Sequence, residues 1–171
     1  MDYNFCLIGM TGVGKTTFGQ FLAQHYHLSF LDTDLVIEAD LKCSIQSFMD
    51  AEGEASFLHH EHRILMDVEI PKNMVMSTGG SAIYYPDVMT KFKSMLTVIY
   101  LRDDCHRILS RIQSLKSRGV VGLSHKTFES LYAEREPLYR MYADIVLDVS
   151  DPISLDDMLS QLESLLHCTD V

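Results

Sequence analysis

One stretch near the N-terminus, Gly9–Thr17, constrains the fold more than any other part of the chain. Its sequence, GMTGVGKTT, matches the pattern G-x-x-x-x-G-K-[ST] at every fixed position. The apolar run Phe5–Ile8 leads into it, and a helix-compatible segment, Lys15–His25, leads away. Glycines let backbone N–H groups turn toward phosphate oxygens, and a helix N-terminus adds partial positive charge. The sequence therefore predicts a nucleotide-binding protein of the α/β class.

The motif also assigns roles to its own residues. Lys15 supplies a mobile positive charge for the β- and γ-phosphates of ATP, and the hydroxyl of Thr16 is placed for Mg²⁺. The residues expected to bind ATP within this loop are Gly12, Val13, Gly14, Lys15, Thr16 and Thr17.

Composition excludes several other classes. A chain of 171 residues with 47% hydrophobic content fits one compact domain, residues 1–171. The net charge of −10 repels polyanions and argues against a nucleic-acid partner. No apolar run approaches the roughly 20 residues that span a bilayer, and Met1–Asn4 lacks the basic and hydrophobic regions typical of a signal peptide. We expect a cytoplasmic monomer without a membrane partner, whose four scattered cysteines are reduced.

Short apolar runs separated by helix-length segments predict strands. They are Tyr3–Ile8, Ser29–Leu31, Met74–Ser77, Thr97–Leu101 and Ile145–Val149. This alternation predicts a five-stranded parallel sheet with helices on both faces, a three-layer α/β/α arrangement. Near the C-terminus, Ser154 and Asp157 have the spacing of a capping box at the start of a leucine-rich helix.

Two segments interrupt the simple alternation. An insertion at about residues 34–70 contains two short helices within Leu35–Ala51 and a longer one over Glu54–Val68. We expect it to form a cap over the carboxyl ends of the strands, where open parallel sheets bind ligands. The stretch at about residues 112–124 carries glycines and cations. It is either an ordinary surface loop or a mobile lid that brings Arg118 over the phosphates.

Polar residues follow the second and third predicted strands. Asp34 is the candidate for positioning and deprotonating the attacking hydroxyl, and Asp32 for contacting Mg²⁺ through water. The alternative for Asp34 is a helix N-cap. The pair Gly79-Gly80 either forms a plain turn or lets backbone N–H groups reach the substrate. Arg135, flanked by two glutamates, is by itself also compatible with an exposed ion pair.

Taken in order, these motifs resemble the shikimate kinase family, small enzymes with the nucleoside-monophosphate-kinase fold. The resemblance covers nearly the full length. It rests on Gly9–Thr17, Leu31–Asp34, Gly53-Glu54 with Phe57 and Glu61, Ser77–Gly80, and Arg135 with Pro137-Leu138-Tyr139. It implies a P-loop kinase with a helical substrate-binding insertion and a lid loop. The implied reaction is phosphorylation of the 3-hydroxyl of shikimate by MgATP, in the biosynthesis of aromatic amino acids.

The resemblance implies roles for individual residues. Asp34, Lys15 and Arg118 are the implied catalytic residues, with Arg118 acting from the lid. Arg111, Arg118 and Pro152 complete the implied ATP site. The implied substrate-binding residues are Asp34, Leu58, Glu61, Gly79, Gly80, Ser81 and Arg135, of which Arg135 binds the substrate carboxylate.

Two positions depart from the family pattern. Where the family has an arginine that helps Arg135 clamp the carboxylate, this chain has Leu58. An arginine–carboxylate contact contributes about 1.5–3 kcal/mol, so its loss predicts roughly ten- to hundredfold weaker binding. His62, one helical turn on, is expected to compensate in part if protonated. Ser81 stands where the family usually has a third glycine, and its hydroxyl is a candidate substrate contact.

Three hypotheses follow. The first is a shikimate kinase. The second, motivated by Leu58 and Ser81, is a related enzyme that phosphorylates another small hydroxylated acid or a polyol. The third is a nucleotide-binding regulator without transfer activity, against which the intact Lys15, Thr16 and Asp34 argue. A GTPase is disfavoured because no N-K-x-D guanine motif occurs.

Overall fold

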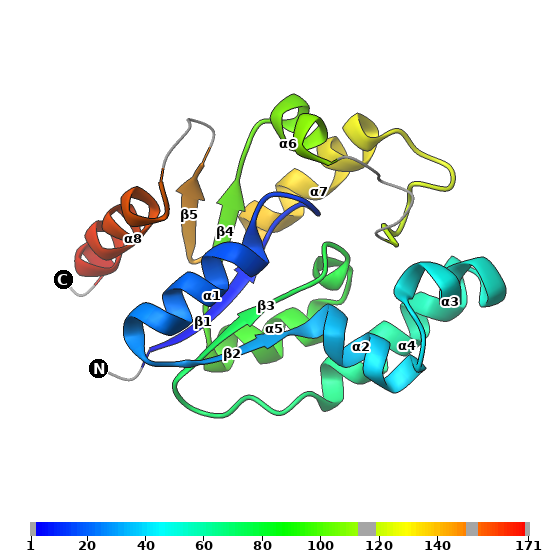
Figure 1. The fold of residues 1–171 in the computed structure, drawn as a ribbon, viewed down its shortest axis with the longest axis horizontal. Coiled ribbons are helices and arrows are strands. Elements are labelled where there is room, and N and C mark those ends of the chain that lie inside the picture. The colour runs from blue at the N-terminus through cyan, green and yellow to red at the C-terminus, as the bar shows by residue number, and fades with distance from the viewer. Residues whose placement is uncertain (1–2, 113–118, 150–153, 170–171) are drawn as a thin grey trace.

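The computed structural model describes residues 3–112, 119–149 and 154–169, and these form three layers around a central sheet (Figure 1). Within these ranges five strands run parallel in the order β2-β3-β1-β4-β5. Their bounds are β1 (Asn4–Ile8), β2 (Ser29–Asp32), β3 (Met74–Ser77), β4 (Thr97–Arg102) and β5 (Ile145–Asp148). The predicted parallel sheet is confirmed, and no strand end differs from its predicted position by more than one residue.

The register explains why β1 is apolar along almost its whole length. Leu7 lies opposite Ser77 of β3 on one side and Ile99 of β4 on the other. The side chains of Phe5 and Leu7 are at most 1% exposed, because helices cover both faces of a parallel sheet. The central strand therefore ends inside the molecule, and it delivers the glycine loop to the carboxyl edge of the sheet.

Helices fill the layers on either side of the sheet. Their bounds are α1 (Lys15–Tyr26), α2 (Thr33–Leu41), α3 (Ile45–Glu52), α4 (Glu54–Asp67), α5 (Pro86–Met95), α6 (Cys105–Arg111), α7 (Phe128–Tyr142) and α8 (Leu155–Thr169), with a 3-10 turn η1 (Ala82–Tyr84). The helices α1 and α8 pack together on one face of the sheet, whereas α5 and α7 cover the other (Figure 1). None of the helices in the described ranges combines the length and the apolar character needed to cross a membrane.

The predicted insertion consists of α2, α3 and α4, which lie beyond the carboxyl end of β2 (Figure 1). The two short helices and the longer one are confirmed. Asp32, not Asp34, caps α2: its Oδ1 accepts a hydrogen bond from the N–H of Asp34 at 3.1 Å. The capping alternative for Asp34 is therefore wrong, and its carboxylate is left for other contacts.

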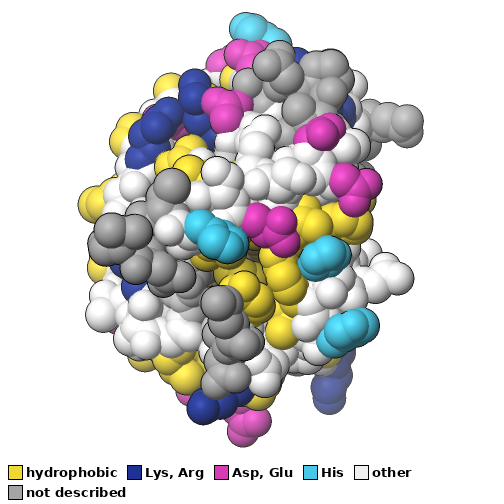
Figure 2. Space-filling view, turned by 90° about the vertical axis from the view of Figure 1, so that its left-hand side faces the viewer, with side chains coloured by type: hydrophobic (Ala, Val, Ile, Leu, Met, Phe, Trp, Pro, Cys, Tyr) yellow, Lys and Arg dark blue, Asp and Glu magenta, His cyan; other side chains and the backbone are white. Residues whose placement is uncertain are grey.

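The C-terminal helix, α8, lies at the left-hand end of the molecule in Figure 1, which is the side that faces the viewer in Figure 2. Its predicted capping box is confirmed, because the N–H of Asp157 donates to Ser154 Oγ at 3.1 Å and the N–H of Ser154 donates to Asp157 Oδ2 at 2.9 Å. Tyr26 Oη of α1 donates to Glu163 Oε1 of α8 at 3.0 Å. Figure 2 shows hydrophobic side chains between histidines on this face.

Candidate active site

A cavity of about 240 Å³ opens at the carboxyl ends of β1, β2 and β3. Several residues predicted to bind ATP or metal line it, namely Gly12, Gly14, Lys15, Thr16, Thr17, Asp32 and Arg111. Val13 does not, since its side chain is 4% exposed and belongs to the core. The structure therefore gathers most of the predicted nucleotide residues around one cavity.

Lys15 is buried at the first position of α1. Its Nζ donates hydrogen bonds to the carbonyl oxygens of Gly9 at 2.8 Å and Met10 at 3.0 Å. The N-cap, Gly14, has φ of 110° and no side chain, so the first N–H groups of α1 are not capped by a side chain. The ammonium group and the positive end of the helix dipole thus lie together, an arrangement suited to phosphate oxygens.

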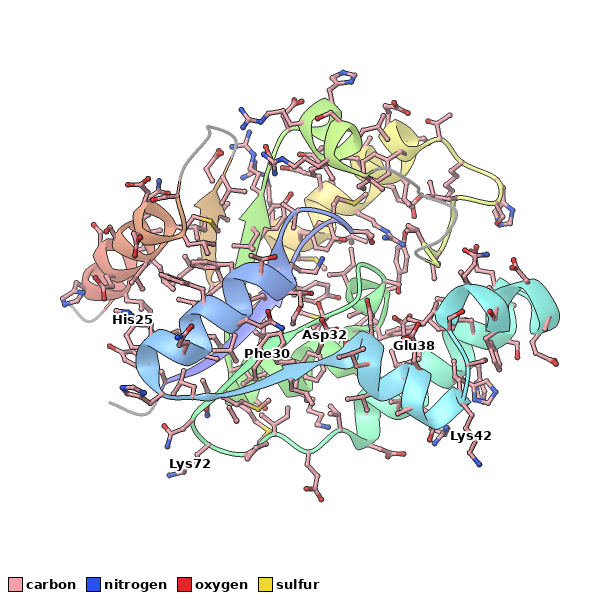
Figure 3. All side chains as sticks on the ribbon, viewed as in Figure 1. His25, Phe30, Asp32, Glu38, Lys42 and Lys72 are labelled. Carbon is pink, nitrogen blue, oxygen red and sulfur yellow. The ribbon has the colours of Figure 1, made fainter. Side chains whose placement is uncertain are left out.

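Thr16 and Asp32 form the part of the cavity that fits a divalent cation. Thr16 Oγ1 donates to Asp32 Oδ2 at 2.8 Å, and Figure 3 shows Asp32 at the carboxyl end of β2. A hydroxyl and a carboxylate are hard oxygen donors, the type that Mg²⁺ prefers when phosphates and water supply its remaining ligands. The donor set therefore fits Mg²⁺.

Asp34 lies in the first turn of α2 and lines the same cavity. Burial raises the pKa of this carboxyl group to about 6, with a further contribution from the charge of Asp32, whereas Lys15 lowers it. A Cβ placed on Gly79 would lie 2.6 Å from Asp34 Oδ1, so only glycine leaves room for the carboxylate there. At neutral pH Asp34 is mostly ionised and basic enough to accept a proton.

A second, smaller cavity of about 30 Å³ adjoins the first, and we call it the acceptor cavity. Asp34, Gly80 and Thr11 line both cavities. The predicted substrate residues that line the acceptor cavity are Asp34, Glu61, Gly79, Gly80, Ser81 and Arg135. They come from α2, from α4, from the loop after β3 and from α7. Asp34 thus stands where the nucleotide cavity meets the acceptor cavity.

Arg135 supplies the buried cation of the acceptor cavity and is 1% exposed. Its Nε donates to Tyr84 Oη at 3.0 Å and its Nη2 to the carbonyl oxygen of Val121 at 2.9 Å. Its guanidinium carbon lies 5.1 Å from the centre of the Tyr84 ring. A Cβ on Gly80 would lie 2.8 Å from Arg135 Nη1, so the glycine keeps this side of the guanidinium accessible.

The glutamates that flank Arg135 have other partners. Glu134 pairs with Lys126, and Glu136 pairs with Arg140. The interpretation of Arg135 as an exposed ion pair is therefore wrong, because the guanidinium is buried and directed into the molecule.

Glu61 is 1% exposed and also lines the acceptor cavity. Ser81 Oγ donates to Glu61 Oε1 at 2.6 Å, and Tyr85 Oη donates to Glu61 Oε2 at 2.8 Å. Burial raises the pKa of Glu61 to about 7, although both hydroxyl hydrogen bonds lower it. The Ser81 hydroxyl, expected to contact the substrate, is thus engaged by a carboxyl group of the protein.

Leu58 and His62 are not among the residues that line either cavity. Leu58 is partly buried, and its carbonyl oxygen lies 2.9 Å from Tyr85 Oη, whose single hydrogen is shared between this oxygen and Glu61 Oε2. His62 Nε2 lies 2.8 Å from Asp87 Oδ2, and both side chains are substantially exposed. The structure therefore does not bring His62 to Arg135 as the expected compensation for Leu58 requires.

The remaining ATP residues are placed only in part. Arg111, at the end of α6, has its Nη1 2.7 Å from Oδ2 of the buried Asp103. The next residue, Ile112, packs over the glycine loop, since a Cβ on Gly12 would lie 2.6 Å from its Cδ1. Arg118 and Pro152, predicted for the lid and the adenine side, lie outside the described residues.

A third cavity, of about 800 Å³, is not lined by any of these predicted residues. It lies between α3 and the segment 120–128. Glu54 of α4 joins this segment to the insertion, because its Oε2 accepts hydrogen bonds from the N–H of Gly122 at 2.8 Å and from Ser124 Oγ at 3.2 Å. The same segment supplies the Val121 carbonyl to Arg135.

Three residues that the sequence did not single out contact the predicted ones. Tyr84 and Tyr85 come shortly after Gly79-Gly80, and they bind Arg135 and Glu61 respectively. Aromatic residues beside a predicted substrate loop are a sequence signal that could have indicated these contacts. Val121 contributes only its carbonyl oxygen, which no side-chain pattern reveals.

Tyr139 connects the two cavities from α7. Its Oη donates to the carbonyl oxygen of Gly80 at 2.8 Å and lies 3.8 Å from Met10 Sδ in the glycine loop. Its ring stacks on Tyr100 of β4, with centroids 5.1 Å apart. One buried side chain, that of Tyr139, therefore contacts the loop after β3, the glycine loop and the sheet.

The chain is similar in sequence to known proteins. A shikimate kinase of Chromobacterium violaceum is 36% identical over 149 residues, 86% of this chain and 81% of that protein. One of Francisella tularensis subsp. novicida is 37% identical over 150 residues, 86% and 85% of the two chains.

Solved structures give the same result. A shikimate kinase from Acinetobacter baumannii in complex with shikimate has a TM-score of 0.85 and 29% identity, over 96% of this chain and 93% of the other. One from Aquifex aeolicus has a TM-score of 0.80 and 25% identity, over 98% of each. The family model for shikimate kinase matches residues 11–165. The chain belongs to the shikimate kinase family.

Proposed function

We propose that this protein transfers the γ-phosphoryl group of MgATP to the 3-hydroxyl of shikimate. The observation that carries the proposal is the position of Asp34, a carboxyl group shared by the phosphate-binding cavity and the acceptor cavity. Family membership and the similarity to a structure in complex with shikimate support the choice of acceptor. The product belongs to the biosynthesis of aromatic amino acids.

The glycine loop, Gly9–Thr17, binds the phosphates of the nucleotide through the backbone of Gly12–Thr17. When the nucleotide binds, the ammonium group of Lys15 gives up its hydrogen bonds to the carbonyl oxygens of Gly9 and Met10 and donates to phosphate oxygens instead. Arg111 and Ile112 border the rest of the nucleotide. Thr16 and, through water, Asp32 would hold Mg²⁺, which would neutralise charge on the phosphates.

The acceptor side supplies orientation and a base. Arg135 binds the acceptor carboxylate, and the Gly79-Gly80 backbone contacts its hydroxyl groups. The 3-hydroxyl oxygen forms the new bond to the γ-phosphorus while the bond from that phosphorus to the β–γ bridging oxygen breaks. The hydroxyl proton passes to Asp34, which is ionised at neutral pH.

We also propose that the chain is a single domain that works as a monomer in the cytosol, with residues 34–70 as the substrate-binding insertion and residues 112–124 as the lid. MgATP is available in that compartment. Cys6, Cys43 and Cys105 are free thiols, in accord with a reducing environment.

A second candidate acceptor is another small hydroxylated acid. The absence of a cation at Leu58 favours it, because a single arginine then binds the carboxylate. The two candidates are separated by the specificity ratio kcat/KM, measured for shikimate and for a panel of related hydroxy acids.

A coupled assay of ADP formation tests the proposal. We expect shikimate-dependent ADP release that requires Mg²⁺ and yields a product phosphorylated at the 3-hydroxyl, as identified by phosphorus NMR. Absence of shikimate-dependent ADP formation at millimolar acceptor would refute it. A higher kcat/KM for a related acid would favour the second candidate.

A further inference from the structure

Both departures from the family pattern lie close to Glu61. Ser81 contacts its side chain directly, whereas the backbone carbonyl of Leu58 contacts Tyr85, which also contacts Glu61. Ser81 Oγ binds Glu61 Oε1 at 2.6 Å, and Tyr85 Oη lies 2.8 Å from Glu61 Oε2. The same tyrosine hydroxyl lies 2.9 Å from the carbonyl oxygen of Leu58. Ser81 is 5% exposed and Glu61 1%. Neutral hydroxyl groups therefore engage both oxygens of a buried carboxyl group at the acceptor cavity.

Buried carboxylates are usually paired with a cation, and the family pattern has an arginine where this chain has Leu58. Positions 58 and 61 are three residues apart on α4, so their side chains share a face and an arginine at 58 would reach Glu61. Leucine offers no donor. Within the described part of the chain, the ion pairs do not include Glu61. A buried carboxylate without donors is costly, so other donors are required here.

The groups that face Glu61 come from several elements. Asp34 of α2 raises its pKa, whereas Arg135 of α7 and the hydroxyls of Ser81 and Tyr85 lower it, against the larger effect of burial. Removing one hydroxyl therefore makes the ionised form of Glu61 less favourable and leaves its side chain less fixed.

We propose that Ser81 and Tyr85 are positioning residues that hold the Glu61 carboxyl group at the acceptor cavity, in place of the cation that position 58 lacks. The identity of the acceptor rests on the proposed function, but the hydrogen bonds do not. Ser81 and Leu58 are then a matched pair rather than two independent changes. The serine hydroxyl becomes dispensable when a cation is returned to position 58.

A double-mutant cycle tests this coupling. We expect Ser81→Ala to raise the KM for shikimate about tenfold, the effect of one hydrogen bond to a charged group, with the KM for ATP within about twofold. Tyr85→Phe should act in the same direction. In the Leu58→Arg variant, Ser81→Ala should raise the KM for shikimate by less than about threefold. An equal fold-change in both backgrounds would overturn the proposal.

Tyr26→Phe is the matched control. It also removes a hydroxyl–carboxylate hydrogen bond, from Tyr26 Oη to Glu163 Oε1, but at the contact between α1 and α8. Both KM values should stay at the wild-type level. A rise in the KM for shikimate equal to that in Tyr85→Phe would overturn the assignment, because a general loss of stability would then explain both.

Thermal unfolding without any acceptor separates this inference from the proposed function. Ser81→Ala should lower Tm more at about pH 8 than at about pH 5, because Glu61 is ionised at the higher pH and has lost a donor. Leu58→Arg should abolish that difference, and its persistence would refute the positioning role. If unfolding shows the coupling but shikimate elicits no ADP formation, the proposed function fails and the positioning role stands.

Discussion

The nucleotide cavity and the acceptor cavity adjoin each other but are built differently. One continuous segment, Gly9–Thr17, supplies more of the residues that line the nucleotide cavity than any other segment does. Residues from several separate segments line the acceptor cavity, and its buried polar side chains are held by hydrogen bonds to one another and to Tyr84. A local motif thus determines the first cavity, whereas tertiary packing determines the second. Substitutions at the two cavities should therefore change different kinetic parameters.

The largest effect is expected at the carboxyl group that both cavities share. Asp34→Asn keeps the shape of the side chain but cannot accept the hydroxyl proton, so kcat should fall by about 10²–10⁴-fold. The affinity for ATP, measured by calorimetry, should remain within about twofold, because the contacts of the glycine loop are intact.

Asp40→Asn is the control on the same helix, where Asp40 forms an exposed ion pair with Arg63. Its kinetic constants should match the wild type. Undiminished turnover in Asp34→Asn would remove Asp34 from the chemistry.

Lys15→Ala tests the nucleotide cavity alone. Loss of the ammonium group should lower kcat by about 10²–10³-fold, because charge that develops on the transferred phosphoryl group loses a preorganised partner. Unlike Asp34→Asn, it should also weaken ATP binding in calorimetry. Unchanged ATP affinity in Lys15→Ala would contradict the assignment of Lys15 to nucleotide binding.

Arg135→Lys tests the acceptor cavity. The charge is kept, but a lysine cannot reproduce the planar contacts with Tyr84 and Val121. The KM for shikimate should rise about ten- to hundredfold, while the KM for ATP should stay within about twofold.

Arg140→Lys, on the exposed side of the same helix, should leave both KM values unchanged. If Arg135→Lys raised both KM values equally, a general disturbance of α7 would explain the result better than a lost substrate contact.

The smallest effect concerns stability. Burial raises the pKa of Glu61 from 4.5 to about 7, so the folded protein binds this proton more tightly than the unfolded chain does. The free energy of unfolding should therefore fall as pH rises from about 4.5 to about 7. Glu61→Gln should raise Tm at about pH 8 by a few degrees, since about 1 kcal/mol shifts Tm by about 2–4 °C in a domain of this size.

Glu52→Gln, at an exposed position of α3, is the control and should leave Tm unchanged. A lower Tm for Glu61→Gln at about pH 8 would show that the ionised carboxylate stabilises the fold.

Local patterns explain why so much of the fold was predictable. The continuous apolar runs identify buried parallel strands, because both faces of such a sheet are covered. The glycine pattern of the loop and the capping box at Ser154 depend on neighbours within a few residues. These are the features that a single sequence records directly.

The acceptor cavity was predictable only through the resemblance to a family, and its internal contacts were not. Nothing in the sequence shows that Ser81 binds Glu61, because the two lie twenty residues apart on different segments. The pairing of His62 with Asp87 likewise depends on how α4 meets α5. The burial of Arg135 overrides its acidic neighbours in the sequence, which bind Lys126 and Arg140 instead.

Tyr139 gives the two cavities a common support, since its hydroxyl binds the Gly80 carbonyl and touches Met10 of the glycine loop. A displacement of either loop on ligand binding is therefore transmitted to a residue that the other loop also contacts. The factor by which ATP changes the affinity for the acceptor must equal the factor by which the acceptor changes the affinity for ATP. One titration, in either order, therefore measures how much cooperativity this shared contact supports.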